Sequence, residues 1–381
     1  MVRIAHLADT HLGYKQYNLD ERENDIYESL EGIGDKILEE HADIVIHSGD
    51  LFDSPRPTPQ AYCAFKKFLR KLDGKVKIFA VLGDHDRPKS RGLAPHVLFE
   101  DQMQVLGVSG NAEHQCVNVG GQDVLVAGLS NLSRTYHMVL VEELKKLGAL
   151  QLDSKLGVLV LHEGIDKFFP YEGAFELSLD EVPRNFDYVA MGHLHARIKA
   201  SFGEGELAYS GSSEIIRKDE ISSWKKLGKG FYVVDLEGDN VEVRDVNLEC
   251  IRSQIEVKLS YAHLEKELGD VVKQTESMEK LPIVHVRVEG KDIDRQGVHQ
   301  ALTDALAGKT LTFRQEVVEE AELRLPELKP GSFYVNQVIR DYFKDENVAG
   351  LALEMLKYLR YGDTAEAKKV ADEYFQKVKK A

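Results

Sequence analysis

The sequence predicts an α/β protein in which two packed β-sheets are flanked by helices, followed by a small α+β domain and C-terminal helices. Three observations predict this. Strand-like apolar runs alternate with amphipathic helical stretches over residues 1–248, the alternation resumes over 249–322, and helical stripes follow beyond a Pro- and Gly-containing segment. A chain of 381 residues is long enough for two or three domains.

The first part begins with a predicted strand at residues 2–7 and a helix at 22–40, in which Ile26, Leu30, Ile33 and Ile37 recur at helical spacing. A second helix is expected at 59–72. Further strands are predicted at 43–47, 76–82, 123–128, 157–161, 188–191 and 230–236.

The second part, residues 249–322, has the order βαβαβ. Its strands are predicted at 255–259, 283–288 and 310–318, with helices around Leu268 and Leu302. Residues 323–332 form a linker by composition, because Pro326, Pro330 and Gly331 lie within them.

Residues 333–381 are expected to form two or three amphipathic helices. Their apolar stripes are Val348, Leu351, Met355 and Leu359, then Ala367, Val370, Tyr374 and Val378. Asp363 is the predicted cap of the last helix, with Glu366 three residues on. Such helices either pack on their own domain or dock on a partner, and the sequence leaves both open.

The composition is that of an ordinary globular protein, with 43% hydrophobic and 30% charged residues. No apolar run has the length of a membrane span, and the first residues enter a strand directly, so we expect no secretory signal and a cytoplasmic, nucleoid-associated location. The three cysteines form no CxxC, which argues against thiolate metal ligands. A net charge of −15 argues against a globally basic nucleic-acid binder but does not exclude local basic patches.

Five short polar motifs follow apolar runs, and they supply seven potential metal ligands. The motifs are Asp9-Thr10-His11, Gly49-Asp50, Gly83-Asp84-His85-Asp86, an isolated His162, and Gly192-His193-Leu194-His195. Strand ends are where open sheets gather ligands. The expected ligands are Asp9, His11, Asp50, Asp84, His162, His193 and His195, enough for two divalent cations and metal-assisted phosphoester hydrolysis.

Mixed oxygen and nitrogen ligands suit manganese, iron or zinc more than calcium. The glycine before Asp50, Asp84 and His193 is expected to allow the turn that aims each side chain over its strand end. Each motif alone is weak evidence, since an isolated His162 is more often a core histidine. The prediction rests on the occurrence of all five motifs in one chain, each of them directly after a predicted strand.

The order DxH, GDxxD, G(N/D)HD, H and GHxH resembles the calcineurin-like metallophosphoesterase superfamily. Three segments, HLADTHLG at 6–13, HSGDLF at 47–52 and AYSGS at 208–212, are similar to archaeal double-strand-break repair nucleases of the meiotic-recombination-eleven type. The resemblance covers the first two thirds of the chain strongly. The remainder matches in layout rather than in motif.

The resemblance implies a role for each position. Asp9, His11 and His195 would hold one metal ion, Asp84, His162 and His193 the other, and Asp50 would bridge them. His85 would protonate or stabilise the leaving oxygen. Asp53 would pair with His85, as the corresponding aspartate does in related phosphatases, whereas many of the repair nucleases have histidine there.

Asp84 departs from the family pattern, which has asparagine at this position. A third carboxylate removes one positive charge from the cluster, which should tighten metal binding and weaken stabilisation of an anionic transition state. Either catalysis is slower, or another cation such as Arg87 compensates. Alternatively, Asp84 coordinates as asparagine would and the effect is small.

Phosphate contacts are expected from residues near the ligand loops, although any one of them could be an ordinary solvated side chain. The candidates are Tyr14, Lys15, Arg56, Arg87, Lys89, Arg91, Arg197 and Lys199. Lys225, Lys226 and Lys229, beside Trp224, add a further basic stretch.

The resemblance further implies a DNA nuclease with two Mn²⁺ ions per subunit, with Mg²⁺, Fe²⁺ or Zn²⁺ as other possible occupants. It would be a 3′-to-5′ double-strand exonuclease and single-strand endonuclease, and its second domain would cap DNA. A homodimer would form through residues 62–72 and 93–103, and the terminal helices would bind an SMC-like ABC-type ATPase of the Rad-fifty kind. Two alternatives remain: a phosphatase or cyclic-nucleotide phosphodiesterase of the same superfamily, and a DNA-end tether with weak catalysis.

Overall fold

The computed structural model describes residues 1–88, 92–150, 155–169, 175–238, 240–319, 339–340, 342–343, 345–359 and 364–378. The chain divides into two compact units, Met1–Val318 and Glu319–Ala381. The linker predicted at 323–332 and the cap predicted at Asp363 lie outside the described residues.

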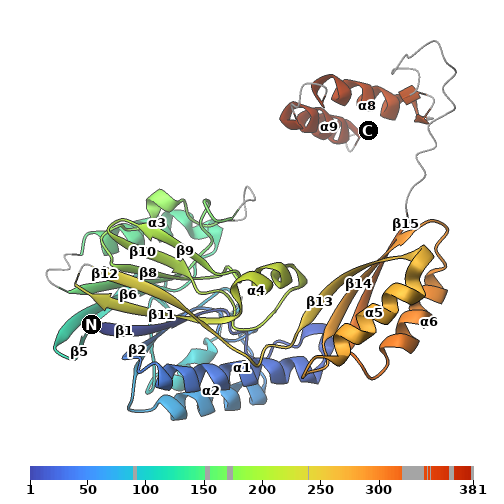
Figure 1. The fold of residues 1–381 in the computed structure, drawn as a ribbon. Coiled ribbons are helices and arrows are strands. Elements are labelled where there is room, and N and C mark those ends of the chain that lie inside the picture. The colour runs from blue at the N-terminus through green and yellow to red at the C-terminus, as the bar shows by residue number, and fades with distance from the viewer. Residues whose placement is uncertain are drawn as a thin grey trace. The chain divides into compact units, whose positions relative to one another are not determined.

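Two six-stranded sheets form the centre of the first unit (Figure 1). The first sheet has the spatial order β12 (Asn240–Asn247), β11 (Gly230–Glu237), β1 (Val2–Leu7), β2 (Ile44–Ser48), β3 (Lys77–Val81) and β4 (Gln104–Val105). The second has the order β5 (Glu113–Val119), β6 (Gln122–Leu129), β7 (Leu156–His162), β8 (Tyr188–Gly192), β10 (Gly205–Tyr209) and β9 (Ile198–Phe202).

Most central strands of both sheets pair in parallel and are largely buried. Strands β1, β2 and β3 pair in parallel in one sheet, and β6, β7, β8 and β10 in the other. Strands covered on both faces are near-continuous apolar runs, which is why these segments stand out in the sequence. Parallel pairing brings the carboxyl ends of the strands, and the polar motifs that follow them, to one edge of each sheet.

The inner faces of the two sheets pack on each other through apolar side chains such as Ile4, Ile46, Val126 and Val160. Helices α1 (Asp20–Glu39) and α2 (Pro59–Leu72) cover the outer face of the first sheet, and α3 (His137–Gly148) covers the second (Figure 1). Helix α2 begins where it does because the Thr58 hydroxyl accepts a hydrogen bond from the Ala61 N–H and Pro59 fits the first turn.

A separate three-stranded sheet follows, with the order β13 (Gln254–Ser260), β14 (Ile283–Gly290) and β15 (Thr312–Glu319). Helices α5 (Leu264–Glu276) and α6 (Arg295–Leu306) pack on one of its faces around Val284, Val286 and Leu302. The second unit contains helices α8 (Glu346–Leu359) and α9 (Thr364–Val378), with Ala349 and Ala367 buried.

The predicted fold class is confirmed: two packed sheets with flanking helices, a small α+β part and C-terminal helices. The predicted domain boundaries at 248, 322 and 332 stay a prediction. The elements of the first unit that were not expected include strands β4, β5, β9, β10 and β12 and helices α3 and α4 (Ile221–Leu227). None of the described helices is both long and apolar enough to cross a membrane.

Candidate metal centre

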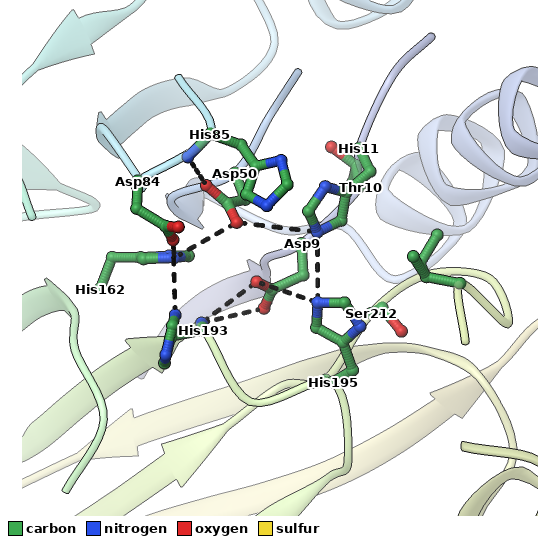
Figure 2. A network of polar contacts seen from close by, with 12 residues as sticks. Asp9, Thr10, His11, Asp50, Asp84, His85, His162, His193, His195 and Ser212 are labelled. Atoms are coloured by element: carbon green, nitrogen blue, oxygen red, sulfur yellow. Dashed lines mark hydrogen bonds and ion pairs between the residues drawn. The ribbon is translucent and has the colours of Figure 1, made fainter. Parts of the chain in front are cut away.

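The structure brings all seven predicted ligands together at the carboxyl ends of strands from both sheets (Figure 2). Asp9 and His11 follow β1, Asp50 follows β2, and Asp84 follows β3. From the second sheet, His162 ends β7, while His193 and His195 follow β8. The loops after β1, β2 and β3 of the first sheet and those after β7 and β8 of the second sheet are far apart in the sequence, and they meet at one site.

One group of donors contains Asp9, His11 and His195. Nε2 of His11 lies 3.2 Å from Nε2 of His195, and the latter lies 4.0 Å from Oδ1 of Asp9. Two imidazole nitrogens facing each other at this distance cannot both present lone pairs unless a proton or a cation lies between them. This geometry suits a shared metal ion.

The other group contains Asp84, His162 and His193. Oδ1 of Asp84 lies 3.4 Å from Nε2 of His162 and 3.5 Å from Nδ1 of His193. Asp50 lies between the groups, because its Oδ2 is 3.5 Å from Nε2 of His162 and 3.7 Å from Nε2 of His11 (Figure 2). A single carboxylate thus faces both clusters.

The donor set fits divalent cations. Nε2 of His162 is buried and has no hydrogen-bond partner among the described residues. Nor does a lysine or arginine of the described chain pair with Asp9, Asp50 or Asp84. Burial opposes protonation of His11, yet the carboxylates of Asp53, Asp50 and Asp9 raise its pKa to about 9. The cluster therefore attracts positive charge.

Several ligand positions have an unusual backbone conformation. Asp9, His11, Asp50 and His193 have φ values of 50°, 43°, 55° and 89°, in the left-handed region that non-glycine residues rarely adopt. Each such residue costs of order 1 kcal/mol or more unless its surroundings hold it. Strain concentrated on four of seven candidate ligands is typical of a functional site.

Glycine is required before the ligands for two different physical reasons. Gly49 has a φ of 92°, as the turn hypothesis expected. Gly83 and Gly192 do not have positive φ, and the physical reason there is space. A Cβ on Gly83 would lie 2.0 Å from Oδ1 of Asp50, and one on Gly192 would lie 1.9 Å from the carbonyl oxygen of Ser48.

His85 lies at the open side of the centre, with 44% of its side chain exposed. Its predicted partner contact differs in detail. Nδ1 of His85 is 2.9 Å from the backbone carbonyl oxygen of Asp53 and 3.6 Å from that residue's carboxylate. The carboxylate lies nearer to Nδ1 of His11, at 3.3 Å. The main-chain oxygen of Asp53 thus makes the hydrogen bond to His85, while its carboxylate lies within ion-pair distance of both His85 and His11. The role of the Asp53–His85 pair in catalysis stays a prediction.

Supporting residues around the centre were not identified from the sequence. The buried carboxylate of Asp86 accepts hydrogen bonds from the backbone N–H groups of Leu51, Phe52 and Gly83, which fastens the Asp50 and Asp84 loops together. Asp86 is the last residue of the Gly83-Asp84-His85-Asp86 motif, so the sequence could have indicated a role for it. The Ser48 carbonyl oxygen, 2.7 Å from Nδ1 of His162, has no sequence signature.

Two further buried carboxylates were also missed. Glu163 accepts hydrogen bonds from the Leu132 N–H and the Asn131 side chain, and thereby ties the His162 loop to its neighbour. Glu220 lies 2.6 Å from Nδ1 of His195. Neither stands in a motif, although Glu163 directly follows a predicted ligand.

The predicted DNA contacts divide into exposed and buried residues. Arg197 is only 6% exposed, and its guanidinium donates to the Leu227, Phe231 and Val246 carbonyl oxygens. That prediction is wrong, because the guanidinium is buried and its terminal nitrogens donate to these carbonyl oxygens and to the Asn247 side chain, so it does not face solvent. Lys229 is likewise buried, not part of a basic surface.

Other candidates are partly engaged. Arg87 donates to the Asn131 carbonyl oxygen, Lys199 pairs with Asp245 at 2.8 Å, and Lys15 pairs with Asp20. Tyr14 is half-buried, and its burial raises the pKa of its hydroxyl. Arg56 is exposed, and no ion pair holds it within the described chain. Lys89 and Arg91 lie outside the described residues.

Comparisons with known proteins agree with this geometry. The family model described as "Calcineurin-like phosphoesterase" matches residues 2–197. The protein named "DNA double-strand break repair protein Mre11" from Methanocaldococcus jannaschii is 32% identical, over 98% of this chain and 98% of that protein. Proteins of the same name from Saccharolobus solfataricus and Thermoplasma acidophilum are 33% and 31% identical, covering 94% of this chain and 95% and 94% of theirs.

Similarity at this level over nearly whole chains extends beyond the sandwich to the small domain and the tail. Together with the convergent donor set, it makes this chain an enzyme, a metal-dependent phosphodiesterase of the nuclease kind. The chain belongs to the calcineurin-like phosphoesterase family and, within it, to the Mre11 family of archaeal DNA double-strand break repair proteins.

Proposed function

We propose that this chain is a manganese-dependent two-metal DNA nuclease, a 3′-to-5′ exonuclease on duplex ends and an endonuclease on single strands, which acts in double-strand-break repair. The observation that carries the proposal is the meeting of four imidazoles and three carboxylates, with Asp50 facing both groups. The names of the relatives support the DNA substrate and the repair role.

In this proposal, Asp9, His11 and His195 hold one ion, Asp84, His162 and His193 hold the other, and Asp50 contacts both. When bound, two divalent cations would activate a water molecule and stabilise charge on the phosphodiester. Mn²⁺ accepts both oxygen and imidazole ligands, and Mg²⁺, Fe²⁺ or Zn²⁺ are other possible occupants.

His85 is the proposed proton donor to the 3′ oxygen that leaves. Its ring is exposed at the open side of the centre, next to His11 at a centroid distance of 4.8 Å, and the Asp53 main chain holds Nδ1. Because Nδ1 donates its proton to that carbonyl oxygen, the proton for the leaving oxygen has to come from Nε2, so His85 would act in its doubly protonated, imidazolium form. Asp53 orients both this ring and that of His11.

DNA binding is proposed for Tyr14, Lys15, Arg56 and Arg87, with Lys89, Arg91 and Lys199 as further candidates. Arg56 is the strongest, because it is exposed and its loop also carries Asp53. Phosphate contacts of this kind position the duplex without reading its sequence.

Two kinds of partner are proposed. Exposed Leu93 and Leu98, 76% and 66% accessible, with Val97 beside them, support a homodimer through residues 62–72 and 93–103. On the second unit, Leu359 and Phe375 are 45% and 57% exposed, which supports binding of an SMC-like ABC-type ATPase of the Rad-fifty kind. We place this activity in the cytoplasm, at the nucleoid.

The test is cleavage of end-labelled duplex and hairpin DNA with Mn²⁺, in parallel with hydrolysis of a small phosphate ester. The proposal expects DNA products that shorten from the 3′ end and loss of cleavage in chelator. Release of phosphate from the small ester without cleavage of DNA would instead indicate a phosphatase. DNA bridging with no cleavage above that of His85→Ala would indicate a tether.

A further inference from the structure

A buried ion pair lies directly behind the metal centre. The carboxylate of Glu220 and the ammonium of Lys229 are 2.6 Å apart, with side chains only 4% and 3% exposed. Glu220 ends a short 3-10 helix (Lys218–Glu220), and Lys229 directly precedes β11. A buried ion pair in general adds little net stability to a fold. Stability alone therefore does not explain why this pair lies next to the metal centre.

The pair contacts His195 from two sides. Oε1 of Glu220 lies 2.6 Å from Nδ1 of that imidazole, and Lys229 donates a 3.0 Å hydrogen bond to the His195 carbonyl oxygen. With Nδ1 donating to the carboxylate, Nε2 is left with its lone pair toward His11 and Asp9 (Figure 2). Both the ring and the main chain of this ligand are thus fixed.

The carboxylate itself cannot turn, because its remaining positions are occupied. Oε2 accepts a 3.0 Å hydrogen bond from the Ser212 hydroxyl and one from the Ile216 N–H, and Oε1 accepts one from the Arg217 N–H. The Ser212 N–H also donates to the His195 carbonyl oxygen. Ser212 is the last residue of the AYSGS segment at 208–212, which contains none of the seven candidate metal ligands.

The two donor groups therefore differ in their support. His162, in the other group, is oriented by a neutral backbone carbonyl, the oxygen of Ser48. A carboxylate that accepts from the far nitrogen of a ligand histidine makes the imidazole a stronger donor, and loss of such a partner typically weakens metal binding about 10–100-fold.

We propose that Glu220 is a positioning residue for the group of Asp9, His11 and His195, held by Lys229 and Ser212, and that it sets the affinity of that group for its cation. This inference rests on the proposed function, because it requires that the group binds a metal ion. Lys229 offsets the charge of Glu220, so the support adds orientation without adding net negative charge to the centre.

The experiment is calorimetric titration of the full chain with Mn²⁺, comparing wild type, Glu220→Gln and Glu143→Gln. The control residue Glu143 is also a buried glutamate paired with a lysine, but it contacts Ala112 and Lys146 on the far side of the second sheet. We expect the affinity for one of two ions to fall about 10–100-fold in Glu220→Gln, with the other ion and the control unchanged.

A spectroscopic measurement separates positioning from simple loss of structure. With one equivalent of Mn²⁺, pulsed electron paramagnetic resonance detects imidazole nitrogens coupled to the ion. Glu220→Gln should weaken or remove one nitrogen coupling, whereas Glu143→Gln should keep the wild-type spectrum. Identical spectra and identical affinities in folded Glu220→Gln would overturn the inference.

If Glu220→Gln does not fold, Ser212→Ala takes its place, since it keeps both charges and removes a hydroxyl that contacts the Glu220 carboxylate, the Lys229 ammonium and the Glu214 carbonyl oxygen. Ser212→Ala should lower the affinity for the same Mn²⁺ ion about threefold. Unchanged affinity in this variant would overturn the inference. Titration of the wild type with Mn²⁺ distinguishes failure of the proposed function from failure of the role proposed for Glu220. If wild type binds no Mn²⁺, the proposed function fails. If wild type binds two ions and the folded variants bind both equally well, only the role of Glu220 fails.

Discussion

At the scale of single residues, the candidate centre combines opposite environments. His162 and Asp50 are almost fully buried, whereas the side chain of Asp84 is 49% exposed, although all three are close enough to share an ion. Burial alone would raise the pKa of Asp84, but His162 and His193 outweigh it and hold that pKa well below its ordinary value. A carboxylate whose pKa the neighbouring imidazoles lower therefore stands where the family pattern has a neutral amide.

We predict that Asp84→Asn cleaves DNA faster with Mn²⁺ and binds one ion more weakly. The amide keeps one oxygen donor but restores one positive charge to the cluster, which favours an anionic transition state. If that charge is worth about 1.4 kcal/mol in the transition state, the rate rises about tenfold. The measurement is single-turnover cleavage of end-labelled duplex at saturating Mn²⁺. An unchanged rate would discard the charge argument and favour the view that Asp84 coordinates as asparagine would.

His85→Ala tests the proposed proton donor. We expect cleavage to fall by about 10²–10⁴-fold, the usual contribution of a general acid. Binding of Mn²⁺ should persist, because the seven donors do not include this exposed ring. Cleavage and calorimetric titration are therefore measured on the same preparation. Loss of ion binding together with activity would show that His85 is a metal ligand instead. His85 does lie close enough to His11 and Asp53 to share an ion with them.

At the scale of elements, the sequence predicted most of the buried parallel strands, with β10 as an exception, and missed the edge strands β4, β5, β9 and β12. Strands β1, β2, β3, β7 and β8 are largely apolar, and the polar residues at or just after their carboxyl ends include all seven donors. Strand β5 is largely exposed and lacks such a run, so it was not recognised. Arg197 was misassigned for a related reason: a basic residue after a ligand motif does not show that the β11–β12 hairpin will bury it.

Residues that support ligands were beyond prediction because their partners are remote in sequence. Glu220 approaches His195 across 25 positions, and Ser48 approaches His162 across 114. Such contacts depend on how the two sheets are stacked, which periodicity does not reveal. The spacing of motifs identifies donors, and only the packed fold identifies what orients them.

We predict that Gly192→Ala is destabilising and disrupts the centre. The new methyl group would lie 1.9 Å from the Ser48 carbonyl oxygen, so strands β8 and β2 would have to separate where they carry His193 and Asp50. Overpacking of this kind typically costs about 1–3 kcal/mol, and contact with rigid backbone sets the value near the upper end. The matched control is Gly269→Ala in helix α5, where nothing lies within 4 Å and alanine favours the helix by up to about 1 kcal/mol. Urea unfolding of both variants decides; equal stabilities would contradict the argument.

At the scale of the first unit, a buried ion-pair network joins the sandwich to the small domain. Asp25 on α1 accepts two hydrogen bonds from Arg252, at 2.6 and 2.9 Å, and a third from Arg22 on its own helix. Arg252 lies just before β13 and also donates to the Leu281 carbonyl oxygen, before β14. The two parts are thus connected by directional bonds between elements of both.

Arg252→Met should uncouple the small domain from the sandwich. Methionine fills similar volume but leaves Asp25 with Arg22 as its main partner, and breaking a buried pair on one side typically costs about 3–5 kcal/mol. We expect calorimetry to show β13, β14 and β15 melting ahead of the sandwich, with faster hydrogen exchange confined to these strands. The control is Arg244→Met, whose pair with Glu40 is partly exposed and worth at most about 1 kcal/mol. If both variants melt alike, the Asp25 network does not couple the parts. If only Arg252→Met separates the transitions, the buried carboxylate of Asp25 is what couples the small domain to helix α1.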